Sequence, residues 1–357
     1  MVEKKQSMII KNKKMPSRKS SNNYNSKKRL MEKINLIYIL GTSFSGSTLL
    51  SLILGSQHGV LNVGEIWALE NDYYHNRRCS CGKNVNKCDY WESIIKSYKE
   101  YIINNKLKCF FRFNNHNQKS DLLFNGLALH HRIAHNISTN PEFIFGKQNI
   151  YRYCNKNYFF LRYLLDFFDN KFGYVVDSSK SGDRLIALHS SNLFNIYVVF
   201  LTRNGESIIG KKIYNDRKQY LNISGIDTIK ETIMWELEVR RFLKAIKKLN
   251  IKSCYRTSYE LFSGRPEQVV SSICKQFNIK YNKFSFDKYS NEYFLKKHYH
   301  VFTGNKLISE INSDDEIRPV ERWKGKLTST DRLLFKIVGG GKINRLLSKG
   351  TTPTYHY

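Results

Sequence analysis

The 357-residue chain is poor in proline and in acidic side chains, and it lacks long apolar runs. Its five prolines form no linker, and no internal repeat is visible, so nothing in the sequence indicates several independent domains. The apolar run Ile34 to Leu40 is far shorter than the roughly 20 residues of a membrane-spanning helix. The pair Ile9-Ile10 is too short for the apolar core of a signal peptide. These absences predict a soluble, cytoplasmic protein.

The shortage of acidic residues leaves a large positive charge. The chain has 59 lysines and arginines against 30 aspartates and glutamates, a formal charge of +29. Residues 1 to 33 carry 11 basic and 2 acidic side chains, a charge of +9, which leaves +20 for the remaining residues. Without an apolar period, residues 1 to 33 are predicted to be a disordered tail that could contact anionic surfaces. The charge favours polyanions, anionic membranes or a polyphosphorylated cofactor and does not choose among them.

Seven cysteines are present, an odd number that argues against a complete disulfide framework. Three of them, Cys79, Cys81 and Cys88, form a C-x-C-x6-C pattern that lacks the paired C-x2-C of common zinc sites. The pattern predicts a structural cluster, and free thiols, one disulfide or a metal all remain open. None of these is needed for the chemistry predicted below.

Short apolar strands alternate with helical stretches along the chain. Residues 34 to 40 are β-branched, aromatic or leucine almost throughout, which is typical of a buried parallel strand. Similar runs occur at Tyr174 to Val176 and Ile196 to Leu201, with a weaker one at Ser253 to Thr257, and Thr228 to Leu249 has helical spacing. The alternation predicts an α/β fold of three layers with a central parallel sheet.

We expect a single catalytic domain over residues 34 to 357. Residues 71 to 170 are rich in Tyr, Phe, Asn and His and contain no clear strand pattern. We interpret them as a mostly helical insertion that shapes the pocket for a substrate.

The strand INLIYIL runs directly into the loop GTSFSGST and the apolar segment LLSLILG. A glycine-containing loop between a buried strand and a helix directs several backbone N–H groups and the positive helix end at one point. The sequence therefore predicts a phosphate-binding loop of P-loop type. We expect its ligands to be Ser43, Ser45, Gly46, Ser47 and Thr48.

Two other interpretations of the loop remain open. Gly41 and Gly46 have the spacing of the nucleotide triphosphatase and kinase loop, but Ser47 occupies the position of its lysine. Alternatively, the protein is a basic polyanion- or membrane-binding protein without catalysis.

Three further segments lie at the ends of predicted strands, and a fourth follows the predicted helix after the loop. NIYVVFLTRNGESIIGKK contains Arg203 at a strand end and Lys211 eight residues later, and VVDSSKSGDRLIAL contains Lys180. HGVLNVGEIWAL contains Glu65, and SYELFSGRPEQVV contains Tyr259. The carboxyl ends of parallel strands are where ligands gather in such folds.

Taken in order with the loop, these segments resemble the sulfotransferases that use 3′-phosphoadenosine-5′-phosphosulfate (PAPS), particularly their bacterial and tyrosylprotein-type branches. HVFTGN from His300 and RPVERWKGKLT from Arg318 resemble further blocks of the bacterial members. The resemblance covers about Asn35 to Thr328, in ordered blocks. It implies transfer of a sulfuryl group from PAPS to an acceptor, which could be a carbohydrate, a lipid, a small alcohol or a peptide tyrosine, with no metal required.

The resemblance also implies roles for single residues. Glu65 would be the base, with His58 as the second choice, and Lys180 would approach the bridging oxygen of the donor. Arg203 and Lys211 would hold the 3′-phosphate, with Ser207 as a weaker alternative to Lys211. Tyr259 would lie near the adenine, and Arg322 with Lys324 would close over the 3′-phosphate.

Two residues depart from the family pattern. Many members carry Lys or Arg where this chain has Phe44, so the cation must come from elsewhere, and we predict Lys180. Lys211 replaces the expected serine, and an ammonium keeps the ability to bind phosphate.

Overall fold

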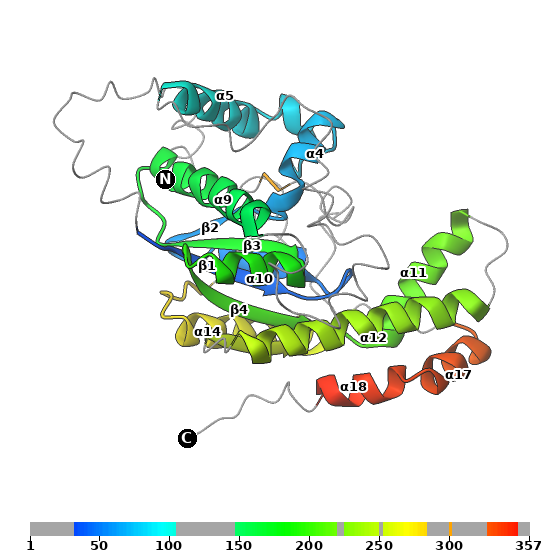
Figure 1. Cartoon of the computed structure of the whole chain (residues 1–357). Coiled ribbons are helices and arrows are strands. Elements are labelled where there is room, and N and C mark those ends of the chain that lie inside the picture. Colours follow the sequence, from blue (N-terminus) through cyan, green and yellow to red (C-terminus); the bar gives the residue numbers. More distant parts are fainter. Residues whose placement is uncertain are drawn as a thin grey trace.

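The computed structural model describes residues 32–104, 147–219, 225–249, 253–283, 300–301 and 327–348. Its centre is a parallel sheet of five strands in the order β2-β3-β1-β4-β5, with helices on both sides (Figure 1). The strands are β1 Ile34–Leu40, β2 Val60–Asn62, β3 Tyr174–Lys180, β4 Phe194–Thr202 and β5 Cys254–Ser258. The predicted α/β class with a central parallel sheet is confirmed.

All four predicted strands are present, and two are longer than predicted. β3 continues to Lys180, and β4 begins at Phe194. The sequence analysis missed β2, whose three residues are too few for a strand pattern to emerge. β2 pairs with β3 at the edge of the sheet and leads to Glu65.

The two faces of β1 pack into different parts of the core. Leu36, Tyr38 and Leu40 belong to a large cluster with side chains of α9, α10 and α12. Ile37 and Ile39 belong to a second cluster with α3, α13 and α14. This alternation, with both faces buried, is what a central strand of a three-layer fold requires.

The helices follow the predicted pattern. Those around the sheet are α3 Ser47–Gly55, α10 Gly182–Ser190, α11 Gly205–Gln219, α12 Gly225–Lys248, α13 Tyr259–Gly264, α14 Pro266–Gln276, α17 Ser329–Ile337 and α18 Gly340–Ser348. Between β2 and β3 lie the short helices η2 Ile66–Ala68 and η3 Val85–Lys87, and α4 Leu69–Tyr74, α5 Asp89–Asn104 and α9 Lys147–Phe167. None of the helices in the described ranges is long and apolar enough to cross a bilayer.

The described parts of residues 71–170 are mostly helical, as predicted, and α5 lies over α9 on one side of the molecule (Figure 1). The predicted tail falls outside the described residues except at its last two positions. The boundary at residue 34 and the role of 71–170 in binding a substrate stay predictions.

The connection from β3 to β4 determines where a ligand can bind. β3 lies on one side of β1 and β4 on the other, so the chain crosses over β1 between them. Loops that follow neighbouring strands diverge at such a point and leave a crevice beyond the carboxyl ends of the strands. The loop after β1 lies at this point.

Candidate functional site

The loop after β1 is shaped by a glycine at the start of α3. Gly46 has φ +87°, a left-handed conformation that glycine adopts without strain. A Cβ atom at this position would lie 2.5 Å from Cδ2 of Tyr259, so the ring of Tyr259 packs directly on the loop backbone. The start of α3 therefore lies beside Tyr259, the residue that follows β5.

The hydroxyl groups of the loop differ in exposure. Ser43 is exposed, whereas Ser45 and Ser47 are buried and Thr48 is half-buried. Within the described part of the chain, Oγ of Ser45 is buried and has no hydrogen-bond partner. A buried hydroxyl without a partner costs free energy unless a ligand or water meets it. This supports the interpretation of the loop as a binding site.

Arg203 follows the end of β4 and contacts the loop directly. Its Nη1 donates to the carbonyl oxygen of Phe44 at 2.7 Å, and its Cζ lies 4.1 Å from the centre of the Tyr259 ring. Burial lowers the pKa of Arg203, while Tyr259 and Glu260 act in the opposite direction. A guanidinium held over an aromatic face keeps its orientation, as phosphate recognition requires.

Lys211 lies on α11, two turns beyond Arg203, and also reaches the loop. Its Nζ is 4.5 Å from the centre of the Phe44 ring. An ammonium from α11 therefore lies beside the loop at Phe44. Phe44 has φ 65°, uncommon for a side chain of this size, and its carbonyl and ring contact Arg203 and Lys211 respectively.

Glu65 and Lys180 form an ion pair on the other side of the loop. Nζ of Lys180 donates to Oε1 of Glu65, with 19% of the Lys180 side chain and 6% of the Glu65 side chain exposed. Lys180 ends β3 in a left-handed conformation with φ 66°, and the pairing register puts it opposite Leu40, the last residue of β1. Lys180 is therefore next to the start of the loop.

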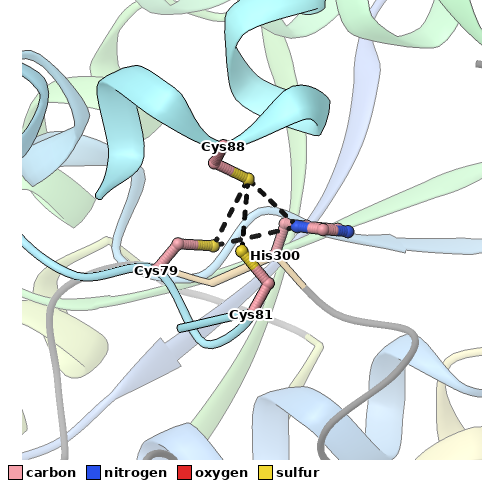
Figure 2. A group of neighbouring side chains, drawn as sticks. All are labelled: Cys79, Cys81, Cys88 and His300. Carbon is pink, nitrogen blue, oxygen red and sulfur yellow. Dashed lines mark hydrogen bonds between the residues drawn. The ribbon is translucent and has the colours of Figure 1, made fainter. Parts of the chain in front are cut away.

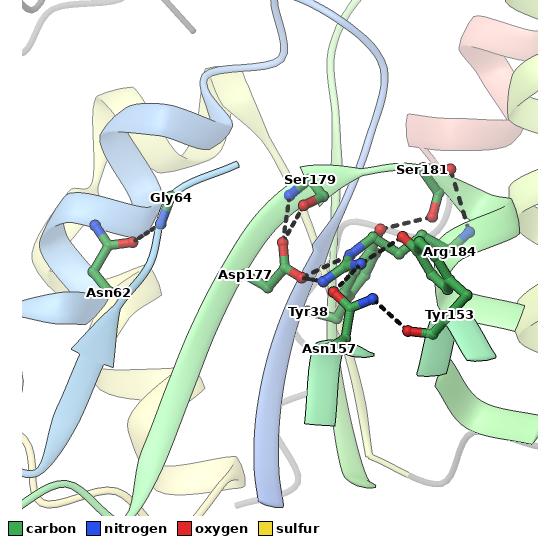
Figure 3. A network of polar contacts seen from close by, with 9 residues as sticks. All are labelled: Tyr38, Asn62, Gly64, Tyr153, Asn157, Asp177, Ser179, Ser181 and Arg184. Carbon is green, nitrogen blue, oxygen red and sulfur yellow. Dashed lines mark hydrogen bonds and ion pairs between the residues drawn. The ribbon is translucent and has the colours of Figure 1, made fainter. Parts of the chain in front are cut away.

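A second ion pair on β3 is fully buried. Oδ2 of Asp177 accepts from Nε and Nη2 of Arg184 on α10, at 2.9 and 2.7 Å. Nη1 of Arg184 donates to Asn157 and Tyr153 of α9 (Figure 3). Burial alone would lower the pKa of Arg184, but Asp177 and Tyr153 raise it above its usual value. This pair joins β3, α10 and α9 behind the site.

The turn before Glu65 is bound to the same strand. The side-chain oxygen of Asn62 accepts from the N–H of Gly64 at 2.9 Å, and the carbonyl of Gly64 accepts from the N–H of Ser178 at 2.9 Å (Figure 3). Gly64 has φ +61°, which a residue with a side chain adopts only with strain. These bonds fix Glu65 relative to Lys180.

The predicted residues lie in one row along the carboxyl edge of the sheet. From β2 to β5 the strand order brings Glu65, Lys180, the loop, Arg203 and Tyr259 next to one another. The loop thus separates a carboxylate and ammonium pair on one side from a guanidinium and an aromatic ring on the other.

Two predicted alternatives lie elsewhere. His58 is exposed and precedes β2, so it lies at the amino edge of the sheet, opposite to the loop, and cannot be the base. Ser207 is buried and its hydroxyl donates to the carbonyl of Asn204 at 2.9 Å within the first turn of α11. Arg322 and Lys324 fall outside the described residues.

One buried carboxyl near the site was not predicted. Asp72 on α4 is 3% exposed, and burial raises its pKa to about 6. Asn71 and Arg77 favour the charged form, whereas Glu65 disfavours it. The burial of Asp72 could not be predicted from the sequence, because it depends on how α4 packs.

No protein-family model matches the chain, and no curated protein matches it in sequence. Its structure is similar to the sulfotransferase domain of the olefin synthase of Synechococcus PCC 7002, with 15% identity, a TM-score of 0.45, and 92% of this chain and 98% of that chain covered. The sulfotransferase domain of the curacin biosynthetic pathway has 14% identity and a TM-score of 0.44, with 86% and 98% covered. Sulfotransferase STF1 of Mycobacterium tuberculosis has 13% identity and a TM-score of 0.42, with 77% and 74% covered.

Proposed function

We propose that this protein is a sulfotransferase that moves a sulfuryl group from PAPS to a hydroxyl or amine acceptor by in-line displacement. The observation that carries the proposal is the row of residues along the carboxyl edge, in which the loop before α3 lies between a cationic, aromatic side and the ion pair of Lys180 and Glu65. A donor with a 5′-phosphosulfate, a 3′-phosphate and an adenine needs these three kinds of group in this order.

The loop would bind the 5′-phosphosulfate through backbone N–H groups and the hydroxyls of residues 43 to 48. The positive end of α3 and the buried hydroxyl of Ser45 support this role. Arg203 and Lys211 would bind the 3′-phosphate on the β4 side, since both cations contact Phe44 of the loop. Tyr259 would border the adenine, because its ring lies against both Gly46 and Arg203.

Lys180 and Glu65 would carry the chemistry on the β3 and β2 side. Glu65 takes the proton of the acceptor as the acceptor oxygen or nitrogen bonds to sulfur. The bond between sulfur and the bridging oxygen breaks, and the leaving group is adenosine 3′,5′-bisphosphate. Lys180 stabilises the charge that develops on the bridging oxygen, as expected for a loose transition state in which positioning and charge stabilisation dominate. No metal takes part in this step.

The ion pair between Lys180 and Glu65 supports a coupled role for the two residues. Each holds the other beside the loop. A negatively charged sulfuryl group near Lys180 would compete with Glu65 for the ammonium. Donor binding would thus free the carboxylate to accept a proton, which links base activation to the presence of the donor.

Calorimetric titration with adenosine 3′,5′-bisphosphate, beside ATP with and without magnesium, tests the proposal. We expect saturable binding of the bisphosphate that is tighter than that of ATP. Arg203→Ala should weaken it, whereas Arg240→Ala, which removes an exposed arginine of α12 paired with Glu236, should not. Preference for magnesium ATP would favour a nucleotide triphosphatase or kinase instead. Salt-sensitive binding of any polyanion without preference would favour a non-catalytic basic protein.

The neighbouring lysines of α11 provide a second, matched comparison. Nζ of Lys211 lies over the Phe44 ring, whereas Nζ of Lys212 pairs with Glu231 of α12 at 2.8 Å. Lys211→Ala should weaken binding of the bisphosphate, and Lys212→Ala should leave it unchanged. Equal effects of the two variants would mean that general charge, not a phosphate site, attracts the nucleotide.

A further inference from the structure

The three cysteines noted in the sequence meet a histidine from a distant part of the chain. The metal-ligating atoms of Cys79, Cys81, Cys88 and His300 all lie within 4.8 Å of one another (Figure 2). Cys79 and Cys88 are buried, and Cys81 and His300 are half-buried. His300 is more than 200 residues from the cysteines in sequence, so the spacing of the cysteines alone could not reveal a fourth ligand.

The distances between these atoms fit a tetrahedral metal site. Sγ of Cys88 lies 3.6 Å from Sγ of Cys81 and 3.7 Å from Sγ of Cys79. Nδ1 of His300 lies 3.1 Å from Sγ of Cys88 and 3.8 Å from Sγ of Cys79. Zinc forms bonds of about 2.3 Å to sulfur and 2.0–2.1 Å to nitrogen. At tetrahedral angles these bonds imply a distance of about 3.8 Å between two sulfur ligands and about 3.6 Å between a sulfur and a nitrogen ligand. Three of the four distances lie within about 0.2 Å of these values, and the distance from Nδ1 of His300 to Sγ of Cys88 is about 0.5 Å shorter.

The backbone around the cysteines holds them in this arrangement. Cys79 and Cys81 lie at the tip of a tight turn in which the N–H of Gly82 donates to the carbonyl of Cys79 at 2.9 Å. The N–H of Cys79 donates to the carbonyl of Lys83 at 2.8 Å, which closes the turn. Cys88 ends η3 and directly precedes α5. Two short elements next to each other in sequence therefore supply three thiols to one point.

His300 is bound to these elements by contacts beyond its ring nitrogen. The carbonyl of His300 accepts from Nε1 of Trp91 at 2.6 Å, and its ring stacks on that of Tyr90 at a centroid distance of 4.6 Å. The N–H of Ser80 donates to the carbonyl of Val301 at 2.8 Å, and the N–H of Val301 donates to the side-chain oxygen of Ser80 at 3.1 Å. Such outer contacts orient a ligand ring before the metal binds.

We propose that Cys79, Cys81, Cys88 and His300 bind a structural zinc ion. Three thiolates and one imidazole in a tetrahedron are a ligand set that zinc prefers, and four protein ligands leave no open position for catalysis. The zinc site ties the turn at residues 79–82 and the start of α5 to residues 300–301. This inference is independent of the proposed function.

The site also has a consequence for the edge of the sheet. A Cβ atom at Gly64 would lie 3.2 Å from Cγ1 of Val301, so Val301 packs on the residue before Glu65. Zinc holds His300, and His300 is followed by Val301. The metal therefore fixes the position of the backbone that carries Glu65.

The test begins with the full-length protein purified under reducing conditions without added metal. We expect one zinc ion per chain by elemental analysis. Exchange for cobalt should give the absorption bands of a tetrahedral site with thiolate-to-metal charge transfer. Folded, reduced protein that contains no zinc and takes up no cobalt would overturn the proposal, as would stoichiometric iron or a disulfide among the three cysteines.

Variants separate the site from a general effect on folding. Cys88→Ser and His300→Ala should lower zinc affinity by about tenfold or more, with a lower melting temperature that added zinc no longer raises. Cys254→Ser, which changes a half-buried cysteine outside the cluster, should keep full zinc content. His300→Cys supplies a fourth thiolate and should keep the metal, with stronger thiolate-to-cobalt charge-transfer bands. Loss of zinc in Cys254→Ser, or its full retention in folded Cys88→Ser, would contradict the assignment.

Discussion

Two ion pairs lie three residues apart on β3, and they differ in almost every physical respect. Asp177 and Arg184 are fully buried, and each makes several hydrogen bonds to fixed partners on three elements. Lys180 and Glu65 are at the carboxyl edge, where 19% of the Lys180 side chain is exposed and its backbone is in a left-handed conformation. We expect Asp177 and Arg184 to remain paired, whereas Lys180 can exchange Glu65 for another anion.

The end of β3 thus carries two pairs with different expected roles. One pair supports the fold, and the other is the one to which we assign the chemistry. A buried pair survives only if all its polar atoms are satisfied, because the desolvation cost is large. The network of Asp177 and Arg184 meets this condition and thereby fixes the end of β3. Lys180 depends on that fixed end for its position beside the loop. The position of Lys180 at the carboxyl edge therefore rests on the buried pair behind it.

Removal of the buried pair should have the largest effect. Arg184→Ala leaves the carboxylate of Asp177 buried without its partner, and we expect a loss of about 3–5 kcal/mol in the free energy of unfolding. Denaturant titration followed by circular dichroism measures it. Arg240, which is exposed and pairs with Glu236 on the same helix, is the control, since Arg240→Ala should cost at most about 1 kcal/mol. Similar costs for both variants would contradict the distinction between the two pairs.

Removal of the Lys180 ammonium at the carboxyl edge of the sheet, the rim of the site, should affect turnover more than stability. We expect Lys180→Ala to lower kcat by about 100- to 1,000-fold, the range found when one donor to a developing negative charge is lost. Its affinity for adenosine 3′,5′-bisphosphate and its free energy of unfolding should change little. Steady-state kinetics with PAPS and a panel of acceptors measures kcat.

The pair of Lys156 and Glu70 serves as a control for Lys180. It is also a partly buried lysine–glutamate pair, but it joins α9 to α4. Lys156→Ala should keep its turnover. A loss of stability in Lys180→Ala with normal turnover would mean that the rim pair is structural like the buried one.

Removal of the Arg203 guanidinium, on the other side of the loop, should affect nucleotide binding more than turnover. Arg203→Ala should weaken binding of adenosine 3′,5′-bisphosphate by about 1.5–3 kcal/mol, the usual value of a hydrogen bond to a charged group. Its kcat at saturating donor should fall less than that of Lys180→Ala, because Arg203 contacts the loop carbonyl and Tyr259 and not the rim pair. If Arg203→Ala lost more in kcat than in affinity, Arg203 and not Lys180 would be the residue that acts in turnover.

The sequence predicted the fold where strands are long and apolar. β1 and β4 were evident from their runs of β-branched and aromatic residues, and the loop after β1 from its glycines and hydroxyls. β2 was missed because a strand of three residues depends on pairing with β3 more than on its own composition. Local patterns thus predict central strands better than edge strands.

The predicted site residues that come together are those that follow strand ends, because strand order alone brings them to one edge. Contacts between side chains could not be predicted in this way. Lys211 reaches Phe44 only because α11 leaves β4 at a particular angle, and His300 meets the cysteines through residues 300–301. His58 was proposed from the family resemblance, and its place at the amino edge became visible only with β2, which the sequence analysis had missed.

Asp72 is a third buried carboxyl to set beside the two ion pairs. Among the described residues, no arginine forms an ion pair with it in the way that Arg184 does with Asp177. Burial raises the pKa of Asp72 to about 6, so the folded state keeps a proton that the unfolded state releases near pH 4. The contribution of Asp72 to stability is therefore fully present below about pH 4 and is lost as the pH rises through about 6. A shift of two units sets an upper bound of about 3 kcal/mol on this loss.

Asp72→Asn removes the charge at nearly constant volume and should stabilise the protein at pH 7. The gain should be about 1–2 kcal/mol, below the upper bound, because the new amide hydrogens require partners that the carboxyl did not need. Denaturant titrations of both proteins from pH 4 to pH 7.5 measure the difference, in which the contributions of all other carboxyl groups cancel. The difference should be smallest at pH 4 and grow as the pH rises through 6. A constant difference over this range would mean that folding does not raise the pKa of Asp72.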